Sequence, residues 1–221
     1  MKILAALFFF QFFDSRTSIF KGVQQEIVIS AFKKGGEDTH PLSMTLLESQ
    51  SKQSIINQYV TEATSFRKGL WVLPKSRAEH RAAKHFARSP HNLESIGFTV
   101  KTGYLVPHRS GDLLGNKKYK KSFPVLWSES IQHECFDPES AYRKGRDRWY
   151  TPETQTGLYN EEAILVKRTS SKEQRRRIHS AKVSRSFLSK YKRFVAENHV
   201  NVVTATKEAC VSLFTLEKLM R

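Results

Sequence analysis

Short apolar runs bounded by polar turns constrain the fold of this chain more than any other feature. Residues 5–13 are almost entirely apolar, and residues 25–33 contain consecutive β-branched side chains at Ile27, Val28 and Ile29. Runs of this length are typical of strands, because a helix usually extends over at least about ten residues. The short connection between the two runs predicts that they pair as antiparallel strands.

The first apolar run has an alternative interpretation. Lys2 precedes the apolar residues 3–13, a segment that could serve as the core of a signal peptide. The run is too short to span a bilayer, which requires about 20 apolar residues. Because it leads straight into Asp14-Ser15-Arg16 without a small-residue cleavage site, a buried strand is favoured.

A single helix is predicted in the segment that follows. Residues 37–69 are polar and show only weak periodicity. Ser76 and Glu79 then form a capping box, in which each side chain can satisfy the other residue's backbone N–H. The helix is expected over residues 77–88, because proline at position 90 disfavours the helical conformation of the residue before it.

Beyond residue 90 the pattern changes to short strands. Residues 97–106, 123–127 and 163–168 predict strands, and Gly103 within the first indicates a bulge or a close backbone approach. A second possible capping box lies at Ser170-Ser171-Lys172-Glu173. We therefore expect a domain boundary near residue 90, with α/β structure before it and mostly β structure after it.

The charge of the chain indicates a polyanionic partner. Lys and Arg number 37 against 21 Asp and Glu, which gives a net charge of +16. Residues 101–193 hold 21 of the basic residues and only 10 of the acidic ones, so this part is the expected binding face. A surface of this kind favours nucleic acid as the partner, although a generally basic proteome would give the same balance.

The two cysteines, Cys135 and Cys210, have neither a CxxC partner nor a histidine at metal-ligand spacing. No zinc site and no disulfide framework are expected, and a cytoplasmic location fits. Two acidic pairs, Asp137-Pro138-Glu139 and Glu161-Glu162, lack the spacing that a PD-(D/E)xK nuclease needs to hold a divalent cation. No catalytic, cofactor-binding or metal-ligating residue is therefore assigned.

Four stretches, taken in order, resemble a known family. They are Phe13-Asp14-Ser15-Arg16 with Phe20 and residues 23–29, Val100-Lys101-Thr102-Gly103 with Val106 and Arg109, Pro124-Val125-Leu126-Trp127, and residues 165–173 (LVKRTSSKE) followed by Glu197-Asn198-His199 and Asn201. Their order and spacing resemble the bacterial adenine-specific DNA methyltransferases of restriction–modification systems, in the long, sometimes nuclease-fused branch.

This resemblance implies an α/β remnant of a Rossmann-like methyltransferase sheet, followed by a mainly β (α+β) target-recognition domain. Residues 1–36 would be the last strand pair of the catalytic domain, residues 37–90 a connecting segment, and residues 91–221 part of the recognition domain. The family transfers a methyl group from S-adenosylmethionine to adenine in double-stranded DNA. Its Asn/Asp-Pro-Pro-aromatic motif, which holds the flipped base, is absent, because no two prolines are adjacent.

The expected function is therefore that of a fragment that recognises DNA and needs a separate cofactor-binding methyltransferase fragment to act. The alternatives are a stand-alone basic nucleic-acid-binding protein and a secreted basic protein, and no membrane partner is expected. Lys and Arg suit phosphates, Arg can also read guanine, and Ser, Thr and Asn can contact either. The candidate DNA-binding residues are Lys101, Thr102, Arg109, Lys167, Arg168, Ser171, Lys172, Arg175, Arg176, Arg177, Asn198 and Asn201.

A basic and aromatic stretch, residues 142–150 (YRKGRDRWY), allows two interpretations. Its three aromatic side chains could stack on bases while the arginines contact phosphates. The same side chains could equally pack inside the protein, and the sequence does not decide between these possibilities.

Overall fold

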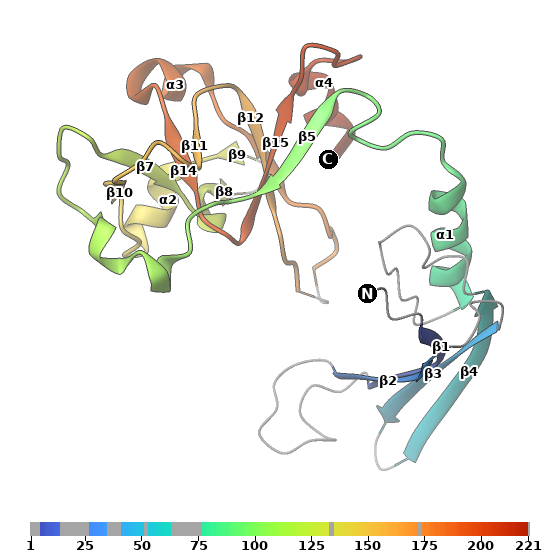
Figure 1. The fold of residues 1–221 in the computed structure, drawn as a ribbon. Helices are drawn as coiled ribbons and strands as arrows, with labels where there is room; N and C mark the ends of the chain where they lie inside the picture. Colours follow the sequence, from blue (N-terminus) through green and yellow to red (C-terminus); the bar gives the residue numbers. More distant parts are fainter. Residues whose placement is uncertain are drawn as a thin grey trace. The chain divides into compact units, whose positions relative to one another are not determined.

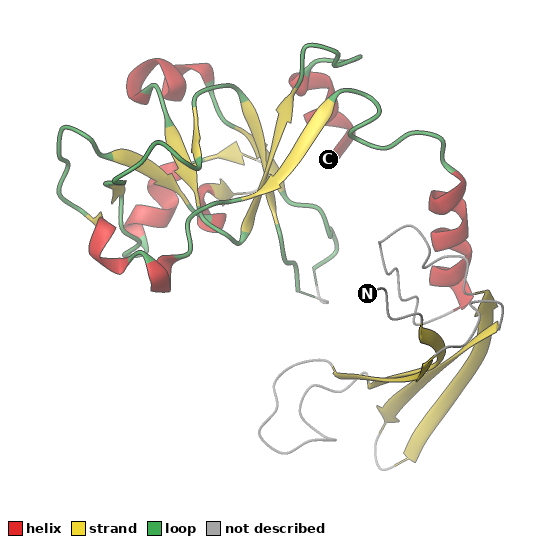
Figure 2. Cartoon of the chain, in the orientation of Figure 1, coloured by secondary structure: helices red, strands yellow, loops and turns green. Residues whose placement is uncertain are grey.

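The computed structural model describes residues 5–13, 27–34, 41–50, 53–62, 77–132, 135–171 and 174–220. The chain divides into two compact units, Met1–Pro90 and His91–Arg221, whose strands and helices are labelled in Figure 1. Strands dominate both units and the few helices are short, as the colours of Figure 2 show. The expected mainly β, α+β composition is confirmed, whereas the Rossmann-like origin of the first unit stays a prediction.

The first unit contains a four-stranded sheet in the order β2-β1-β3-β4. Its strands are β1 (Ala5–Phe13), β2 (Ile27–Lys34), β3 (Pro41–Gln50) and β4 (Gln53–Glu62). The predicted antiparallel pairing of β1 with β2 is confirmed, and β1 pairs with β3 in parallel. The β3–β4 hairpin was not foreseen, because the alternation of Leu42, Met44 and Leu46 is diluted by polar neighbours.

Helix α1 (Arg77–Arg88) completes this unit and has the predicted bounds. Glu79 lies in its first turn and Arg88 in its last turn, where their charges complement the helix dipole. Its end is marked by a hydrogen bond from the Ser89 N–H to the Phe86 carbonyl, 3.1 Å long. Ser76, the predicted cap, lies outside the described residues, and so does the loop between β1 and β2.

The second unit is built on two larger sheets and one small one. The five-stranded sheet has the order β11-β14-β7-β10-β6, the four-stranded sheet β13-β12-β15-β5, and β8 pairs with β9. The strands are β5 (Phe98–Thr102), β6 (Leu114–Gly115), β7 (Phe123–Leu126), β8 (Ile131–Gln132), β9 (Cys135–Phe136), β10 (Trp149–Tyr150), β11 (Leu158–Tyr159), β12 (Ala163–Lys167), β13 (Ser180–Lys182), β14 (Phe194–Ala196) and β15 (Val200–Ala205).

Short helices lie between these strands and after the last of them. They are the 3-10 turns η2 (Pro107–Arg109), η3 (Gly111–Leu113) and η4 (Ser128–Ser130), and the α-helices α2 (Pro138–Arg143), α3 (Arg185–Tyr191) and α4 (Leu213–Met220). Helix α2 starts at Asp137, whose carboxylate accepts a hydrogen bond from the Ser140 N–H. At the second predicted capping box, the described residues 170–171 are not helical. Instead, the Ser171 N–H donates to the Gln174 side chain, and the described residues 174–179 are not helical.

The core of the second unit lies between its two larger sheets. Leu126 and Phe194 from the five-stranded sheet pack against Leu165 and Val202 from the four-stranded one, all at most 1% exposed. The opposite face of the four-stranded sheet is covered by α4, whose Leu213 and Leu216 contact a second apolar cluster. Because both faces of this sheet are covered, β12 and β15 are apolar on both sides rather than alternating.

The chain crosses from one sheet to the other in the turn Glu197-Asn198-His199, which joins β14 to β15. Gly103 packs against this turn: a Cβ atom there would lie 2.1 Å from the Glu197 carbonyl oxygen. The predicted close backbone approach at Gly103 is thus confirmed. Just beyond it, Leu105 forms a parallel bridge with Glu197.

Candidate nucleic-acid interface

Three distant parts of the chain meet where β5, β12 and β15 end or begin. The Gly103 N–H donates to the Val200 carbonyl (2.7 Å), the Arg168 N–H to the His199 carbonyl (2.8 Å), and the Asn198 N–H to the Leu105 carbonyl (2.9 Å). We call the residues brought together here, Thr102, Gly103, Arg168 and 197–201, the Asn198 corner. Several residues of the sequence resemblance thus occupy one place in the fold.

Polar side chains of the Asn198 corner also contact one another. Thr102 and Asn201 are register partners on β5 and β15, so they share a face, and the Thr102 hydroxyl donates to Asn201 Oδ1 at 3.3 Å. Arg168 is exposed and its guanidinium donates to the Asn198 carbonyl at 3.3 Å. A guanidinium has five N–H donors, so most of them remain available to a ligand.

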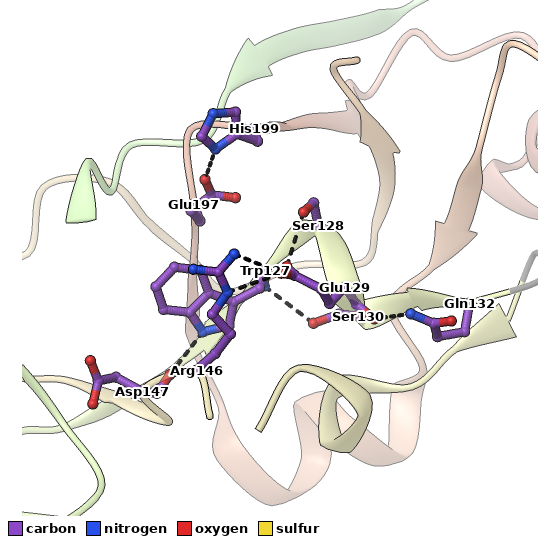
Figure 3. A network of polar contacts seen from close by, with 9 residues as sticks. All are labelled: Trp127, Ser128, Glu129, Ser130, Gln132, Arg146, Asp147, Glu197 and His199. Carbon is purple, nitrogen blue, oxygen red and sulfur yellow. Dashed lines mark hydrogen bonds and ion pairs between the residues drawn. The ribbon is translucent and has the colours of Figure 1, made fainter. Parts of the chain in front are cut away.

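The turn carries a buried acid next to an exposed imidazole, drawn in Figure 3. Glu197 is only 3% exposed, and its Oε1 hydrogen-bonds to Nδ1 of His199, which is 59% exposed. This contact fixes the orientation of the imidazole ring. Within the described part of the chain, Glu197 Oε2 and Asn198 Oδ1 are buried without a hydrogen-bond partner, as are His179 Nε2 and Ser180 Oγ.

Figure 3 also shows the network next to this turn, which is centred on the buried Trp127. The Trp127 indole donates to the Asp147 carbonyl at 2.8 Å, and the Arg146 guanidinium lies 5.2 Å from the centre of its ring. Arg146 also donates twice to Glu129, at 2.9 and 2.8 Å. Burial alone would raise the pKa of Glu129, but the hydrogen bonds from Arg146, from its own backbone and from Ser128 outweigh burial and lower it.

Lys167 is directed toward this network rather than toward Thr102 and Asn201. Its pKa is lowered because burial disfavours the ammonium ion and Lys144 repels it, while Glu129 opposes the shift. The neighbouring Val166 pairs with Asn201, so alternation along β12 places Lys167 on the other face of the sheet. Lys167 is therefore a partly buried residue of the core side.

The loop between β12 and β13 carries a run of exposed basic side chains. Arg175, Arg176 and Arg177 are all exposed there, and Arg177 donates to the Ser171 carbonyl at 2.8 Å. The loop returns to the sheet where the Lys167 N–H donates to the His179 carbonyl at 2.9 Å. It extends beyond the ends of β12 and β13 in Figure 1. Lys172 lies outside the described residues.

Two candidates lie away from the Asn198 corner. Lys101 is exposed on the edge strand β5, but it pairs with Val202 and so faces the opposite side of the sheet from Thr102. Arg109 is exposed at the end of η2, and no contact among the described residues links its side chain to the corner.

In the basic and aromatic stretch 142–150, the aromatic side chains pack inside the protein and the arginines form ion pairs. Trp149 and Tyr150 are buried, and the Tyr142 hydroxyl donates to the Val125 carbonyl at 2.9 Å. Burial raises the pKa of Tyr142. The arginines are paired as well: Arg143 with Asp137, Arg146 with Glu129, and Arg148 with Glu139.

The structure brings out a basic group that is not among the candidates predicted from the sequence. Lys117, Lys120 and Lys121 surround the exposed Tyr119 on the loop between β6 and β7. The signal was present in the sequence as four lysines around one tyrosine, residues 117–121. The family resemblance does not include these residues and so did not predict them.

Comparisons with known proteins add no identification: no protein-family model matches the chain, and neither a curated protein nor a solved structure is detectably similar to it. Among the described residues, no helix is both long enough and apolar enough to cross a membrane. Evidence for function therefore has to come from the residues of the chain itself.

Proposed function

We propose that residues 91–221 bind double-stranded DNA through the Asn198 corner and the arginine-rich loop between β12 and β13. The observation that carries this proposal is that residues of the family resemblance, far apart in sequence, are joined by main-chain hydrogen bonds at one place. Thr102 and Arg168 come from one end of a single sheet, and Asn198 and Asn201 lie between them.

The chemistry of this surface suits a duplex. Arg168, Arg175 and Arg177 have no carboxylate partner among the described residues, so their charges are available to phosphates. A loop projecting from two antiparallel strands is the kind of element that enters a DNA groove. Asn201 and Thr102 supply the uncharged donors and acceptors that base edges or phosphates need, and Glu197 holds His199 beside them.

We further propose that residues 91–221 are the DNA-recognition part of an adenine-specific DNA methyltransferase. The sequence supports it through the ordered stretches that resemble the family. Methyl transfer from S-adenosylmethionine would require a separate cofactor-binding fragment, because the Asn/Asp-Pro-Pro-aromatic motif is absent from these residues. We expect the purified chain to bind DNA without methylating it.

A second candidate is a stand-alone DNA-binding protein without a catalytic partner. The observation that favours it is that residues 91–221 form a compact unit with apolar clusters of their own. The two candidates differ in specificity. A recognition part should bind one duplex sequence more tightly than others, whereas a general binding protein should show no preference.

The deciding experiment measures duplex binding by the purified chain across a salt series. Counterion release predicts that log affinity falls linearly with log salt, with a slope of about −0.9 for each phosphate contact. Arg168→Gln should reduce affinity about fivefold to tenfold and make the slope shallower by about 0.9. Lys207→Gln is the matched control, because Lys207 follows the other end of β15, roughly 20 Å along the strand.

Equal losses in the two variants would mean that general charge, and not the Asn198 corner, carries binding. Salt-independent or undetectable binding would overturn the proposal altogether.

A further inference from the structure

A second basic surface lies on other elements of the same unit. A hollow of about 760 Å³ opens beside η3 and β6 and is bounded by the loop that leads to β7. Its apolar lining comes from Leu113, Leu114 and the ring of Tyr119, and its basic lining from Lys117, Lys120 and Lys121. This volume falls within the range of about 300–1,000 Å³ that is typical of ligand pockets.

The loop that carries the lysines is anchored at both ends. At its start, Asn116 Oδ1 accepts a hydrogen bond from the Arg148 N–H at 3.2 Å. At its end, the buried Ser122 hydroxyl accepts from the Tyr119 N–H at 2.9 Å and hydrogen-bonds to the Thr151 hydroxyl at 2.8 Å. The basic side chains are therefore presented from a fixed backbone, which lowers the entropy that a ligand must offset on binding.

The charges around the hollow are unbalanced. Three of its lining residues are lysines, and the one acid among them, Asp112, forms no ion pair with any described residue. The fourth lysine of the loop has another role: the Lys118 ammonium lies 5.1 Å from the centre of the buried Trp149 ring, and Lys118 does not line the hollow. Lys117 also lies over a ring, that of Tyr119, at 5.5 Å, but this ring is exposed and lines the hollow. The structure thus separates three lysines that line the hollow from one that packs on a buried ring.

We propose that this hollow binds an unpaired nucleotide of a single-stranded nucleic acid. The base would lie on the Tyr119 ring and the two leucines, and the flanking phosphates would be bound by Lys117, Lys120 and Lys121. Tyr119 is 55% exposed, and Lys117 Nζ lies 5.5 Å from the centre of its ring. A base would stack on this exposed ring, and the Lys117 ammonium beside it would bind a flanking phosphate. A free phosphate would leave the apolar lining of the hollow without a contact, and an uncharged apolar ligand would leave the lysines without a counter-charge.

This inference goes beyond the proposed duplex binding and does not depend on it, because it involves different residues. The test uses the full chain and labelled single strands of 15 thymidylates or 15 uridylates, which form no duplex. Stacking predicts that Tyr119→Leu weakens binding about tenfold, while Tyr119→Phe, which keeps the ring, binds like the parent chain. Equal affinities of these two variants would overturn the proposal.

Variants of Lys120 and Lys118 provide a matched electrostatic test. Lys120→Gln should make the salt dependence shallower by about 0.7, the value for one phosphate of a single strand. Lys118→Gln removes the same charge on the other side of Tyr119 in the sequence and should leave that slope unchanged. Equal slopes in the two variants would contradict a site in the hollow.

A covalent readout locates the base directly. An iodouracil placed within the strand should crosslink to the peptide that contains Tyr119 on irradiation, and mass spectrometry identifies that peptide. Binding of either strand supports the proposal, and the tighter one tells DNA from RNA. Binding of neither strand, or crosslinks confined to residues 168–179, would overturn it, whatever the duplex experiment shows.

Discussion

Two arginine-rich segments of this chain differ in the surroundings of their arginine side chains. In residues 142–150, Arg143, Arg146 and Arg148 each meet a carboxylate, and two of them also lie over aromatic rings. In residues 168–179, the arginines extend into solvent on a loop between two strands. The local density of basic residues is therefore a poor guide to binding. Acidic and aromatic side chains are folded against the arginines of the first segment, whereas Arg168, Arg175 and Arg177 of the second have no carboxylate partner among the described residues.

The largest expected effect concerns the packed segment. Trp127 is 3% exposed and anchors the segment through its indole and through Arg146. Trp127→Ala should lower the free energy of unfolding by about 3–5 kcal/mol, because a large buried ring is lost and a cavity remains. Urea denaturation measures this loss. The exposed-loop variant Arg175→Ala should stay within about 0.5 kcal/mol of the parent, and a comparable loss there would show that the loop also packs.

Gly103→Ala should have the next largest effect, because it separates the strands that build the Asn198 corner. The new methyl group would meet the Glu197 carbonyl oxygen, which belongs to a backbone held by hydrogen bonds and has little room to move. We expect a loss of about 3 kcal/mol, at the upper end of the usual range for overpacking. Gly111→Ala is the control, because nothing lies within 4 Å of a Cβ atom at Gly111. Equal unfolding midpoints in urea would contradict the close approach.

These sites show what the sequence could and could not predict. Gly103 and the strands around it were predictable, because an isolated glycine in an apolar run is a local signal. The Asn198 corner was not, since it depends on hydrogen bonds between residues as distant as Leu105 and Asn198. The pairing of Arg148 with Glu139 was hidden as well, because it depends on the turn after α2, which brings Arg148 back to that helix.

A local signal can also mislead. The Ser170–Glu173 pattern suggested a helix start, but the Ser171 N–H bonds to the Gln174 side chain, and the chain turns back toward β13. The β3–β4 hairpin was missed for the opposite reason, because its period-two alternation was present but masked by polar residues. The family resemblance directed attention to Arg168 and Asn198, and away from Lys117, Lys120 and Lys121, which the structure places around the hollow.

A pair of double variants tests whether the two arginine-rich segments differ in DNA binding. Arg175→Gln with Arg177→Gln should weaken duplex binding about tenfold or more and make the salt slope shallower by about 1.8, with the unfolding free energy unchanged. Arg143→Gln with Arg148→Gln removes the same charge from the packed segment. It should cost up to about 1 kcal/mol of stability, because both ion pairs are partly exposed, and leave the salt slope as in the parent. Identical slopes for the two double variants would remove the distinction between the segments.

The smallest expected effect is the pH dependence of the Arg146–Glu129 pair. The pKa of Glu129 in the folded chain is below its ordinary value of 4.5, so the carboxylate binds its proton less readily than in the unfolded chain. The pair therefore stabilises the fold fully above pH 4.5, and this contribution is lost as the pH falls through the lowered pKa. Arg146 is half exposed, so solvent screening limits the contribution to about 1 kcal/mol at most. Urea denaturation of the parent and of Arg146→Gln should thus differ by about that amount at pH 7, and the difference should shrink on acidification. A difference that persists unchanged in acid would mean that Arg146 stabilises the segment through its stacking on Trp127, a contact that does not depend on the charge of Glu129.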